Sequence, residues 1–464
     1  MSTLINKSEA QEAVFPLSGA QQSIWYHQRL NLNATAYNVG QVLHIKGPLD
    51  LVAFNQAHNL MLEKAQALRL QFLVIDDIPY QTVTPFTHLE MPFFDFRSSQ
   101  NSAADVELLL STTEHKPFNL EQDACYRFGL IQTAEEDWSF FMILHHMVID
   151  GVGGGIIIEM LERGYNEHID VNAINSISWK EAVVEYQNYA NSTGWDSDKK
   201  FWAHKLQGLS SPVSLSSLPL NSAALSVPNT ISIIMARDEY NKTLHWANSN
   251  GGSALSAFIT VMLVYLSNIS GERDLCVGTL FSGRHKGSRH LIGMLANHLA
   301  LRTQLAPTDT IHEVTRVVAS ELRSALRHRN YPFGEITSSR RQRALEAPFS
   351  TIVNYLPVAH TPQIGESNGD LEIRGQGPVP DCALHVIEKS DGERVEMRLK
   401  YNVKCYSELE ARGHLERITE LIKALPGLAD TPIAKVNILQ PQERQPLIAQ
   451  SAGPVMALDS NLRT

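Results

Sequence analysis

The segment ILHHMVIDGVGGG, residues 143–155, is the most informative part of this sequence for the fold. An apolar run ends in two consecutive histidines, His145 and His146, and after three further residues come Asp150 and Gly151. Neighbouring side chains on a strand point to opposite faces, so only one of the two histidines can face a given cavity. Asp-Gly predicts a turn at the strand end. There Asp150 is expected to fold back and hold the loop, and Gly151 lets a substrate approach the backbone closely.

A histidine at the end of such a strand suits acyl transfer to an amine. Its ordinary pKa of about 6.5 lets it take up a proton near neutral pH and pass it on. A thioester is already activated, so positioning of the two reactants can supply several kcal/mol of the acceleration without a covalent intermediate. Two adjacent histidines would carry little weight by themselves in a chain with 18 histidines. The apolar strand before them and the Asp-Gly after them make the pattern specific.

Motifs for other chemistries are absent from the sequence. A zinc site needs three or four ligands, and no H-E-x-x-H occurs, so we expect no metal. No G-x-S-x-G elbow and no G-x-G-x-x-G fingerprint occur. The segment GTLFSGRH (278–285) resembles a phosphate loop, but Arg284 and His285 stand where Lys and Ser or Thr are needed.

Composition indicates an ordinary globular protein of 464 residues, long enough for two hydrophobic cores. The net charge of -10 argues against a nucleic-acid partner. The longest apolar stretch, 254–269, is interrupted by hydroxyl side chains and predicts a buried helix rather than a membrane span. The N-terminus has no signal-peptide pattern. The scattered cysteines form no metal or disulfide spacing and indicate a reducing, cytoplasmic environment: Cys125, Cys276, Cys382 and Cys405.

Periodicity predicts two mixed α/β halves, 15–180 and 181–440, after a polar N-terminus (1–14) that we expect to be disordered. A Ser-, Pro- and Leu-rich connection lies at 208–229. Ser18 is expected to cap the first helix, with Ile24 and Trp25 facing the core. The other expected helices are 52–68, 104–115, 156–168, 254–269, 310–329 and 406–425. The expected strands are 37–47, 68–75, 126–132 paired in one sheet with 138–146, 231–236, 276–283, 352–358 and 395–403.

HHMVIDG matches the HHxxxDG motif of acyltransferases of the chloramphenicol acetyltransferase type. Further segments resemble, in the family's order, the blocks of condensation domains of nonribosomal peptide synthetases. These segments are PLSGAQQSIW (16–25), ALRLQF (67–72, with Arg69), FWAHKL (201–206, with Trp202), VGTLFSGRHKGSRHLIGMLANHLALR (277–302, with Asn297), RNYPFGEI (329–336) and LKYNVKCY (399–406). Six blocks in the same order are too many for agreement by chance.

The resemblance implies an α/β fold of two chloramphenicol acetyltransferase-like subdomains in a V-shaped pseudo-dimer with a central tunnel. Phosphopantetheine arms of carrier proteins enter it from opposite faces, and the domain binds no cofactor of its own. Carried over by residue, His146 is the catalytic histidine in a motif completed by His145, Asp150 and Gly151. The family's Asp pairs with an arginine, for which Arg284 is the candidate, and Arg69 is a second expected salt-bridge residue. Tunnel or substrate positions are Gly153, Gly154, Trp202 and Asn297.

The run Val152–Gly155 departs from the family, which often has an aromatic residue and a serine after Asp-Gly. These glycines either leave room for an acyl chain or allow tight helix packing, and both interpretations stay open. Gly334 also replaces the family's usual glutamate.

The first block begins at Phe15, so we expect the domain to open its polypeptide. Its donor is then a carrier protein on a partner polypeptide or an acyl-coenzyme A, with a slight preference for a starter domain that N-acylates the first residue. The irregular segment 441–464 resembles a linker toward a downstream adenylation domain and the acceptor carrier protein.

Three other interpretations remain besides an elongation domain with a peptidyl donor. An epimerization domain usually carries a WRxL-type segment after the motif, where this chain has GGGIII. A wax-ester or acylglycerol synthase would lack the AQQSIW and LxYN blocks. A non-catalytic recruitment domain typically loses the second histidine, and His146 is present.

Overall fold

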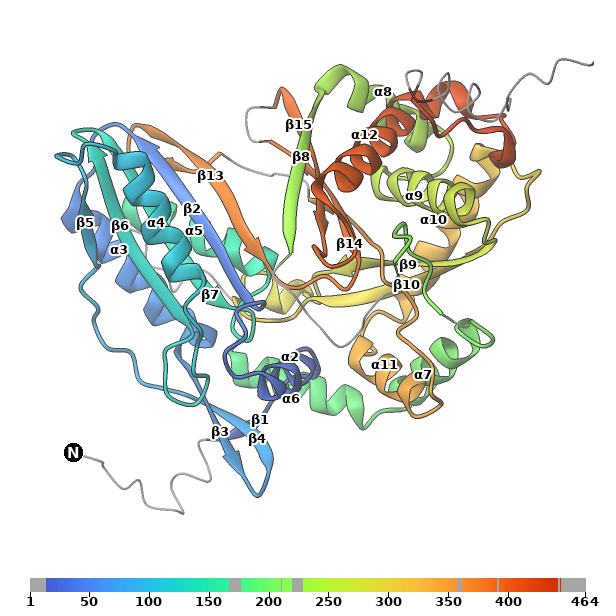
Figure 1. Cartoon of the computed structure of the whole chain (residues 1–464). Coiled ribbons are helices and arrows are strands. Elements are labelled where there is room, and N and C mark those ends of the chain that lie inside the picture. The colour runs from blue at the N-terminus through green and yellow to red at the C-terminus, as the bar shows by residue number, and fades with distance from the viewer. Residues whose placement is uncertain are drawn as a thin grey trace, which may run out of the picture.

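The computed structural model describes residues 14–166, 177–209, 211–218, 228–356, 361–389, 392–440 and 443. The predicted disordered N-terminus (1–14) and the predicted linker (441–464) therefore lie outside the described residues, except for Val14 and Glu443. Figure 1 shows two α/β halves whose sheets diverge from a common base like the arms of a V. The mixed α/β fold predicted from the sequence is confirmed.

The N-terminal half is built on a six-stranded sheet with helices on both faces (Figure 1). Phe54 of α3 packs edge-on against Phe140, 5.4 Å between ring centroids, which places α3 on one face beside α5. The helix α4 covers the other face. In spatial order the strands are β12 (Gln363–Ile364), β13 (Ser367–Gln376), β2 (Asn38–Lys46), β7 (Asp137–His145), β6 (Tyr126–Ala134) and β5 (Phe93–Asp95). The helices are α3 (Leu51–Lys64), α4 (Ser102–Glu114) and α5 (Gly151–Asn166).

A smaller sheet and two helices form the base of this half. The sheet has the order β1 (Phe15–Pro16), β4 (Ile78–Val83) and β3 (Leu70–Ile75), with the 3₁₀ turn η1 (Gln66–Arg69) before β3. The helices are α2 (Gly19–Leu30) and α6 (Trp179–Ala190). Ser18 caps α2 in a capping box with Gln21, and Ile24 and Trp25 are buried, as predicted.

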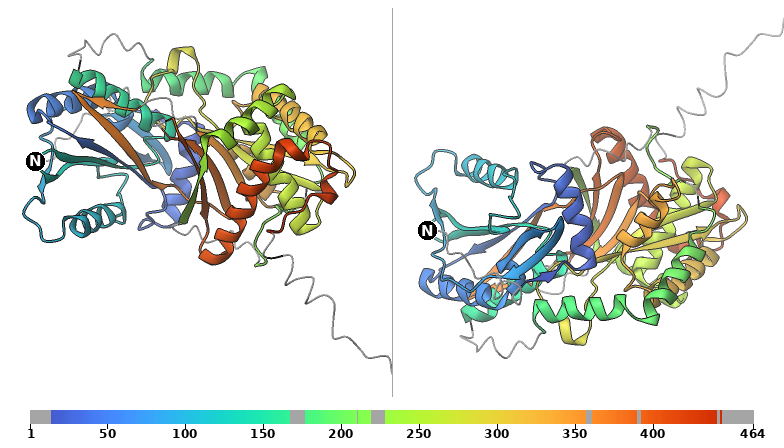
Figure 2. Two further views of the ribbon diagram at one scale, coloured as in Figure 1. Left: turned by 90° about the horizontal axis from the view of Figure 1, so that it is seen from above. Right: turned by 90° about the horizontal axis from the view of Figure 1, so that it is seen from below.

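The C-terminal half has a second six-stranded sheet, and a layer of helices covers its face away from the N-terminal half (Figure 2). Its strands are, in spatial order, β10 (Asn297–Gln304), β9 (Asp274–Phe281), β11 (Ile352–Leu356), β14 (Cys382–Glu388), β15 (Arg394–Tyr401) and β8 (Asn229–Ala236). Its helices are α7 (Thr193–Lys205), α8 (Arg237–Ser249), α9 (Ala254–Ser270), α10 (Ile311–Arg327), α11 (Phe333–Arg341) and α12 (Glu408–Ala424). Short 3₁₀ turns are η3 (Lys286–Ser288), η4 (Leu425–Leu428) and η5 (Ile433–Lys435).

The apolar helix α9 is the centre of the second core. Most of its side chains are buried against the sheet and the neighbouring helices, as the sequence predicts. In the described part of the chain no single helix is both long and apolar enough to cross a membrane. Only α8 and α9 together reach that length and apolarity, and they are bent by 97°.

One strand crosses between the halves, which the division at residue 180 did not predict. β13 belongs to the second half of the sequence, yet it pairs antiparallel with β2, with Leu371 opposite Leu43. Arg374 on β13 is held by Glu114 and, at 2.8 Å, by Glu107 of α4. The chain returns to its own sheet at β14, so the N-terminal sheet is completed by a C-terminal segment (Figure 1).

Candidate active site

His146 stands at the junction of the two halves, directly after the end of β7. Its backbone N–H donates to Tyr37 O at 2.9 Å, and its Nδ1 lies 2.8 Å from Ile149 O. A carbonyl can only accept, so Nδ1 carries the proton and Nε2 keeps a free lone pair. Nε2 faces Gly377 in the connection from β13 to β14, where a Cβ would lie 3.2 Å away. Gly377 also has a φ of +79°, which favours glycine there.

The imidazole of His146 is neutral near pH 7. Burial lowers its pKa below 6.5, and the cationic Lys400 lowers it further, while the Ile149 carbonyl and the Asp150 carboxylate act in the opposite direction. A neutral ring with its lone pair directed between the two halves can accept a proton from an amine.

His145 points to the other side of the strand end and is completely buried. Its Nδ1 accepts from the Met147 N–H at 3.2 Å, and Nε2–H donates to Gln28 Oε1 at 3.4 Å. Burial lowers its pKa to about 3. Both ring nitrogens are therefore occupied by structural hydrogen bonds, and His145 does not share the space that His146 faces.

Asp150 fastens the motif loop to the opposite half. Its Oδ2 accepts from Arg284 Nη1 at 2.8 Å and from the backbone N–H groups of Leu295 and Ala296 at 3.0 Å each. Its Oδ1 accepts from the Gly153 N–H at 2.8 Å. The two charged side chains are only 1% and 5% exposed. The expected Asp150–Arg284 pair is thus a buried link between the β7–α5 loop and the β9–β10 connection.

The glycines after the motif differ in their surroundings. A Cβ on Gly151, the first residue of α5, would meet no atom within 4 Å, so the backbone there is open to approach. A Cβ on Gly153 would lie 2.7 Å from Ile149 Cδ1, and one on Gly154 would lie 2.8 Å from Gln41 Nε2. Of the two open interpretations, the structure favours close packing at Gly153 and Gly154 rather than empty space.

Three predicted residues have other roles than expected. Trp202, expected in the tunnel, is 2% exposed within the C-terminal core, and its indole N–H donates to His328 O at 3.0 Å. Asn297 lines a hollow, but its amide is occupied by the backbone at and just before the start of α11, at Arg329, Tyr331 and Phe333. Arg69 forms no salt bridge with a carboxylate of the described residues. It donates to the carbonyls of Leu62, Glu63 and Thr84, which corrects the expected salt bridge.

Sequence reasoning missed a polar face on the C-terminal sheet. On β15, Glu396, Arg398 and Lys400 alternate with apolar residues of the core and are all buried. Arg398 Nη1 donates to Ile373 O of β13 at 3.3 Å, so this face is turned toward the N-terminal half. His385 of β14 lies opposite Arg398. The period-two alternation in VEMRLKY was the available signal, because it marks one polar face.

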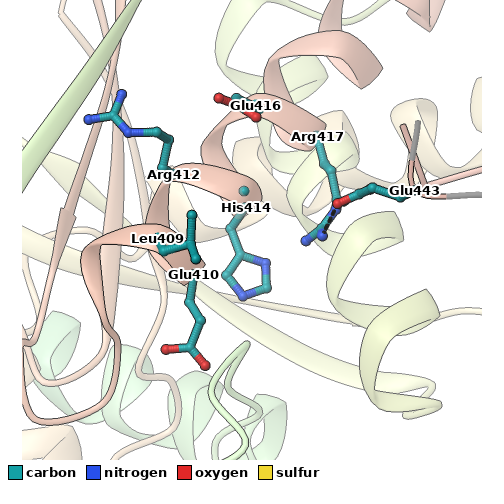
Figure 3. Close-up of a pocket in the computed structure, with 8 residues that line it drawn as sticks. Leu409, Glu410, Arg412, His414, Glu416, Arg417 and Glu443 are labelled. Carbon is teal, nitrogen blue, oxygen red and sulfur yellow. Dashed lines mark hydrogen bonds and ion pairs between the residues drawn. The ribbon is translucent and has the colours of Figure 1, made fainter. Parts of the chain in front are cut away.

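Hollows indent the surface of the described residues. One lies between α2, α6 and the connection that carries Arg284, and Leu295, a donor to Asp150, lines it. Another is formed by α12 and Glu443, where Arg417 pairs with Glu443 (Figure 3). None of its lining residues belongs to the motif loop, so it is not the site of the chemistry. Among the described residues no group of His, Cys, Asp or Glu side chains is arranged to hold a metal ion.

Comparisons with known proteins agree with this arrangement. Residues 11–448 match the family described as Condensation domain. The dimodular nonribosomal peptide synthase of Bacillus subtilis (strain 168) is 23% identical over 95% of this chain, and tyrocidine synthase 2 of Brevibacillus parabrevis is 23% identical over 94%. The chain spans only 19% and 12% of the lengths of these two relatives.

Solved structures show the same fold. A variant of the starter condensation domain of rhizomide synthetase, in complex with C8-CoA and Leu-SNAC, superposes with a TM-score of 0.84. It is 23% identical, and the match covers 93% of this chain and 99% of that one. The first condensation domain of the calcium-dependent antibiotic synthetase gives a TM-score of 0.82 at 19% identity, covering 92% and 99%.

Proposed function

The chain belongs to the condensation-domain family, whose members form amide bonds in nonribosomal peptide synthesis, and on that premise we propose which reaction it performs. It joins a thioester-activated acyl donor to the amine of an aminoacyl group held on the phosphopantetheine arm of a carrier protein. The observation that carries the proposal is His146, a neutral base whose tautomer is fixed by Ile149 O and whose Nε2 faces Gly377 in the connection between the two halves.

The reaction balances with this one proton acceptor. The amine nitrogen attacks the thioester carbonyl carbon, the C–N bond forms, and His146 Nε2 takes the amine proton. Collapse of the tetrahedral intermediate breaks the C–S bond, and the proton passes from Nε2 to the leaving sulfur. The Ile149 carbonyl and the Asp150 carboxylate favour the transient imidazolium, because both raise the pKa of His146.

The donor is the finer part of the proposal. We favour an acyl-coenzyme A donor, so that the domain N-acylates the first aminoacyl group. The support is the likeness to the starter condensation domain of rhizomide synthetase, whose variant structure contains C8-CoA. The glycines at 153 and 154 do not add to this support, since Ile149 and Gln41 fill the space beside them.

A surface on α2 and α11 suits docking of an acidic carrier protein. Tyr26 and Leu30 on α2 are 57% and 85% exposed, large fractions for apolar side chains. The helix α11 packs on α2, and the exposed arginines at 341 and 343 lie at its end. Leu30→Asp is expected to raise KM for an aminoacyl carrier protein while leaving KM for the matching aminoacyl-SNAC unchanged. If the wild-type protein and Leu30→Asp have equal KM values for the carrier protein, this surface does not bind it.

The test of the reaction class uses an aminoacyl-loaded carrier protein, a panel of acyl-coenzyme A donors and, separately, peptidyl carrier proteins. Mass spectrometry of the carrier-bound product should show an acyl mass added from coenzyme A thioesters. If amide product forms only with peptidyl carrier proteins as donors, the domain is an elongation domain rather than a starter domain. Inversion at the α-carbon without amide formation would indicate epimerization, and carrier binding without turnover would indicate recruitment.

A further inference from the structure

Lys400 occupies an unusual position on the inner face of the C-terminal sheet. It lies near the end of β15, between Ala383 of β14 and Thr230 of β8, and is only 2% exposed. Side chains two residues apart on a strand share a face. Lys400 therefore points the same way as Arg398, which reaches β13 of the other half.

The other cations on this face have anionic partners, whereas Lys400 has none among the described residues. Glu396 accepts from Arg398 Nε at 2.8 Å and from Lys389 Nζ at 2.8 Å, so its one carboxylate is already shared by two cations. Within the same part of the chain no hydrogen bond or ion pair is formed by the Lys400 ammonium. Removing an ammonium from water without a partner is costly, and burial alone lowers the pKa of Lys400 to about 7.

A second unpartnered group lies beside it. Both ring nitrogens of His385 on β14 are buried without a hydrogen bond, and the side chain is 7% exposed. His385 opposes Arg398, so it is the diagonal neighbour of Lys400, a separation that long side chains can bridge. Burial lowers the pKa of His385 to about 3, and the positive charge of Lys400 adds to this effect, so its ring is neutral and keeps one N–H donor.

Lys400 also lies close enough to His146 for its charge to act on that imidazole. Lys400 therefore lies on the side of the sheet that is turned toward His146. Two further groups belong to the surroundings: His298 of β10, which is also influenced by His146, and Arg398, which pairs with Glu396. No carboxylate among these groups is available to Lys400.

We propose that Lys400 and His385 form an anion subsite of the tunnel that selects a substrate carrying a carboxylate on its acyl or aminoacyl group. This inference rests on the proposed amide-forming function. One ammonium neutralises one negative charge, and the neutral imidazole adds one N–H donor, which matches the two oxygens of a carboxylate. A dianionic phosphate would keep an unbalanced charge in the same buried position.

The test compares substrates that differ only in the carboxylate. Adipoyl- and hexanoyl-coenzyme A form the donor pair, and carrier proteins loaded with aspartate or asparagine form the acceptor pair. The wild-type protein is expected to prefer one carboxylate-bearing member by about 10- to 100-fold in kcat/KM, the range of a charge-assisted hydrogen bond. Which pair shows the preference identifies the source of the carboxylate.

Lys400→Met removes the charge and keeps most of the side-chain volume. It should abolish the preference, because turnover of the carboxylate-bearing substrate falls far more than turnover of its neutral partner. Lys404→Met is the matched control, because Lys404 lies three residues after the end of β15 and its side chain is exposed to solvent. Circular dichroism and Tm establish that both variants fold, and His385→Phe provides a second variant that should weaken the preference.

Three different results would overturn the subsite. Wild-type turnover with equal kcat/KM for both members of each pair removes the selectivity while leaving the amide-forming function intact. Equal loss of turnover on all substrates in a folded Lys400→Met variant assigns the lysine to the chemical step instead. No amide from any wild-type combination would sink the proposed function and the subsite together.

Discussion

Removing one member of the Asp150–Arg284 pair should destabilise the protein far more than removing the catalytic histidine. Asp150→Ala strands the Arg284 guanidinium, whose side chain is 5% exposed, and leaves the Leu295 and Ala296 N–H groups without their acceptor. Breaking a buried pair from one side costs about 3–5 kcal/mol. His146→Ala removes a partly buried ring with one side-chain hydrogen bond, so its cost should be about 1 kcal/mol.

These free energies convert into melting temperatures. Unfolding entropy of about 2.1 cal/mol/K per residue gives about 1 kcal/mol/K for a chain of this length, so Asp150→Ala should lower Tm by about 3–5 °C and His146→Ala by about 1 °C. Arg284→Met should fall between them, because Asp150 keeps three backbone donors. Calorimetry measures all three variants.

An exposed ion pair supplies the control. Arg29 pairs with Glu121 at 2.8 Å with about half of each side chain exposed, so Arg29→Ala should change Tm by less than about 1 °C. The double variant of Asp150 and Arg284 should lose less stability than the sum of the single variants, because no charge is then stranded. Equal Tm values for Asp150→Ala, Arg284→Met and His146→Ala would show that the Asp150–Arg284 pair does not hold the two halves together.

Three further predictions concern pH and packing. Because burial lowers the pKa of His146, the acid limb of kcat/KM against pH should have its midpoint below 6.5, and a midpoint above 6.5 would exclude a buried neutral base. Burial lowers the pKa of His145 and His385 to about 3, so between pH 6.5 and 3 these two groups bind protons in the unfolded chain but not in the folded chain. The free energy of unfolding should therefore fall as the pH drops through this range, by about 1.4 kcal/mol per pH unit for each group. Urea unfolding at pH 7, 6 and 5 measures this, and a flat profile would show that these rings are hydrated. Gly154→Ala should have a lower Tm than Gly155→Ala, because the new methyl group at 154 meets the Gln41 amide whereas the one at 155 meets open space. The reverse order in a thermal melt would contradict the packing.

The sequence predicts the elements that have a strong local pattern and gives no prediction for others, such as β10, β14 and α7. Alternation identifies β2 and apolar runs identify β6 and β7, and the structure pairs β6 with β7 with Leu130 opposite Phe140. The capping box at Ser18 begins α2 as expected. The continuous apolar run becomes the buried helix α9.

Contacts between segments that are far apart in the sequence could not be predicted, because they depend on the tertiary arrangement. The alternation in SNGDLEIRGQ is compatible with a strand of either sheet, and only the tertiary pairing with β2 places β13 in the N-terminal half. The position of Trp202 in a family block does not reveal that its indole N–H serves His328 O inside a core. The strand that carries Lys400 was predicted, but the face it presents to the other half depends on the arrangement of the two sheets.

The central claim is that His146 accepts the amine proton in amide formation, and a single-turnover comparison tests it most directly. Wild-type protein and His146→Ala are each mixed with an aminoacyl carrier protein and an acyl thioester, and the acylated carrier is quantified by mass spectrometry over time. We expect the variant to form the amide more slowly by a factor on the order of 10²–10⁴, with unchanged carrier binding and a nearly unchanged Tm. Amide formation at the wild-type rate by a folded His146→Ala variant would contradict it.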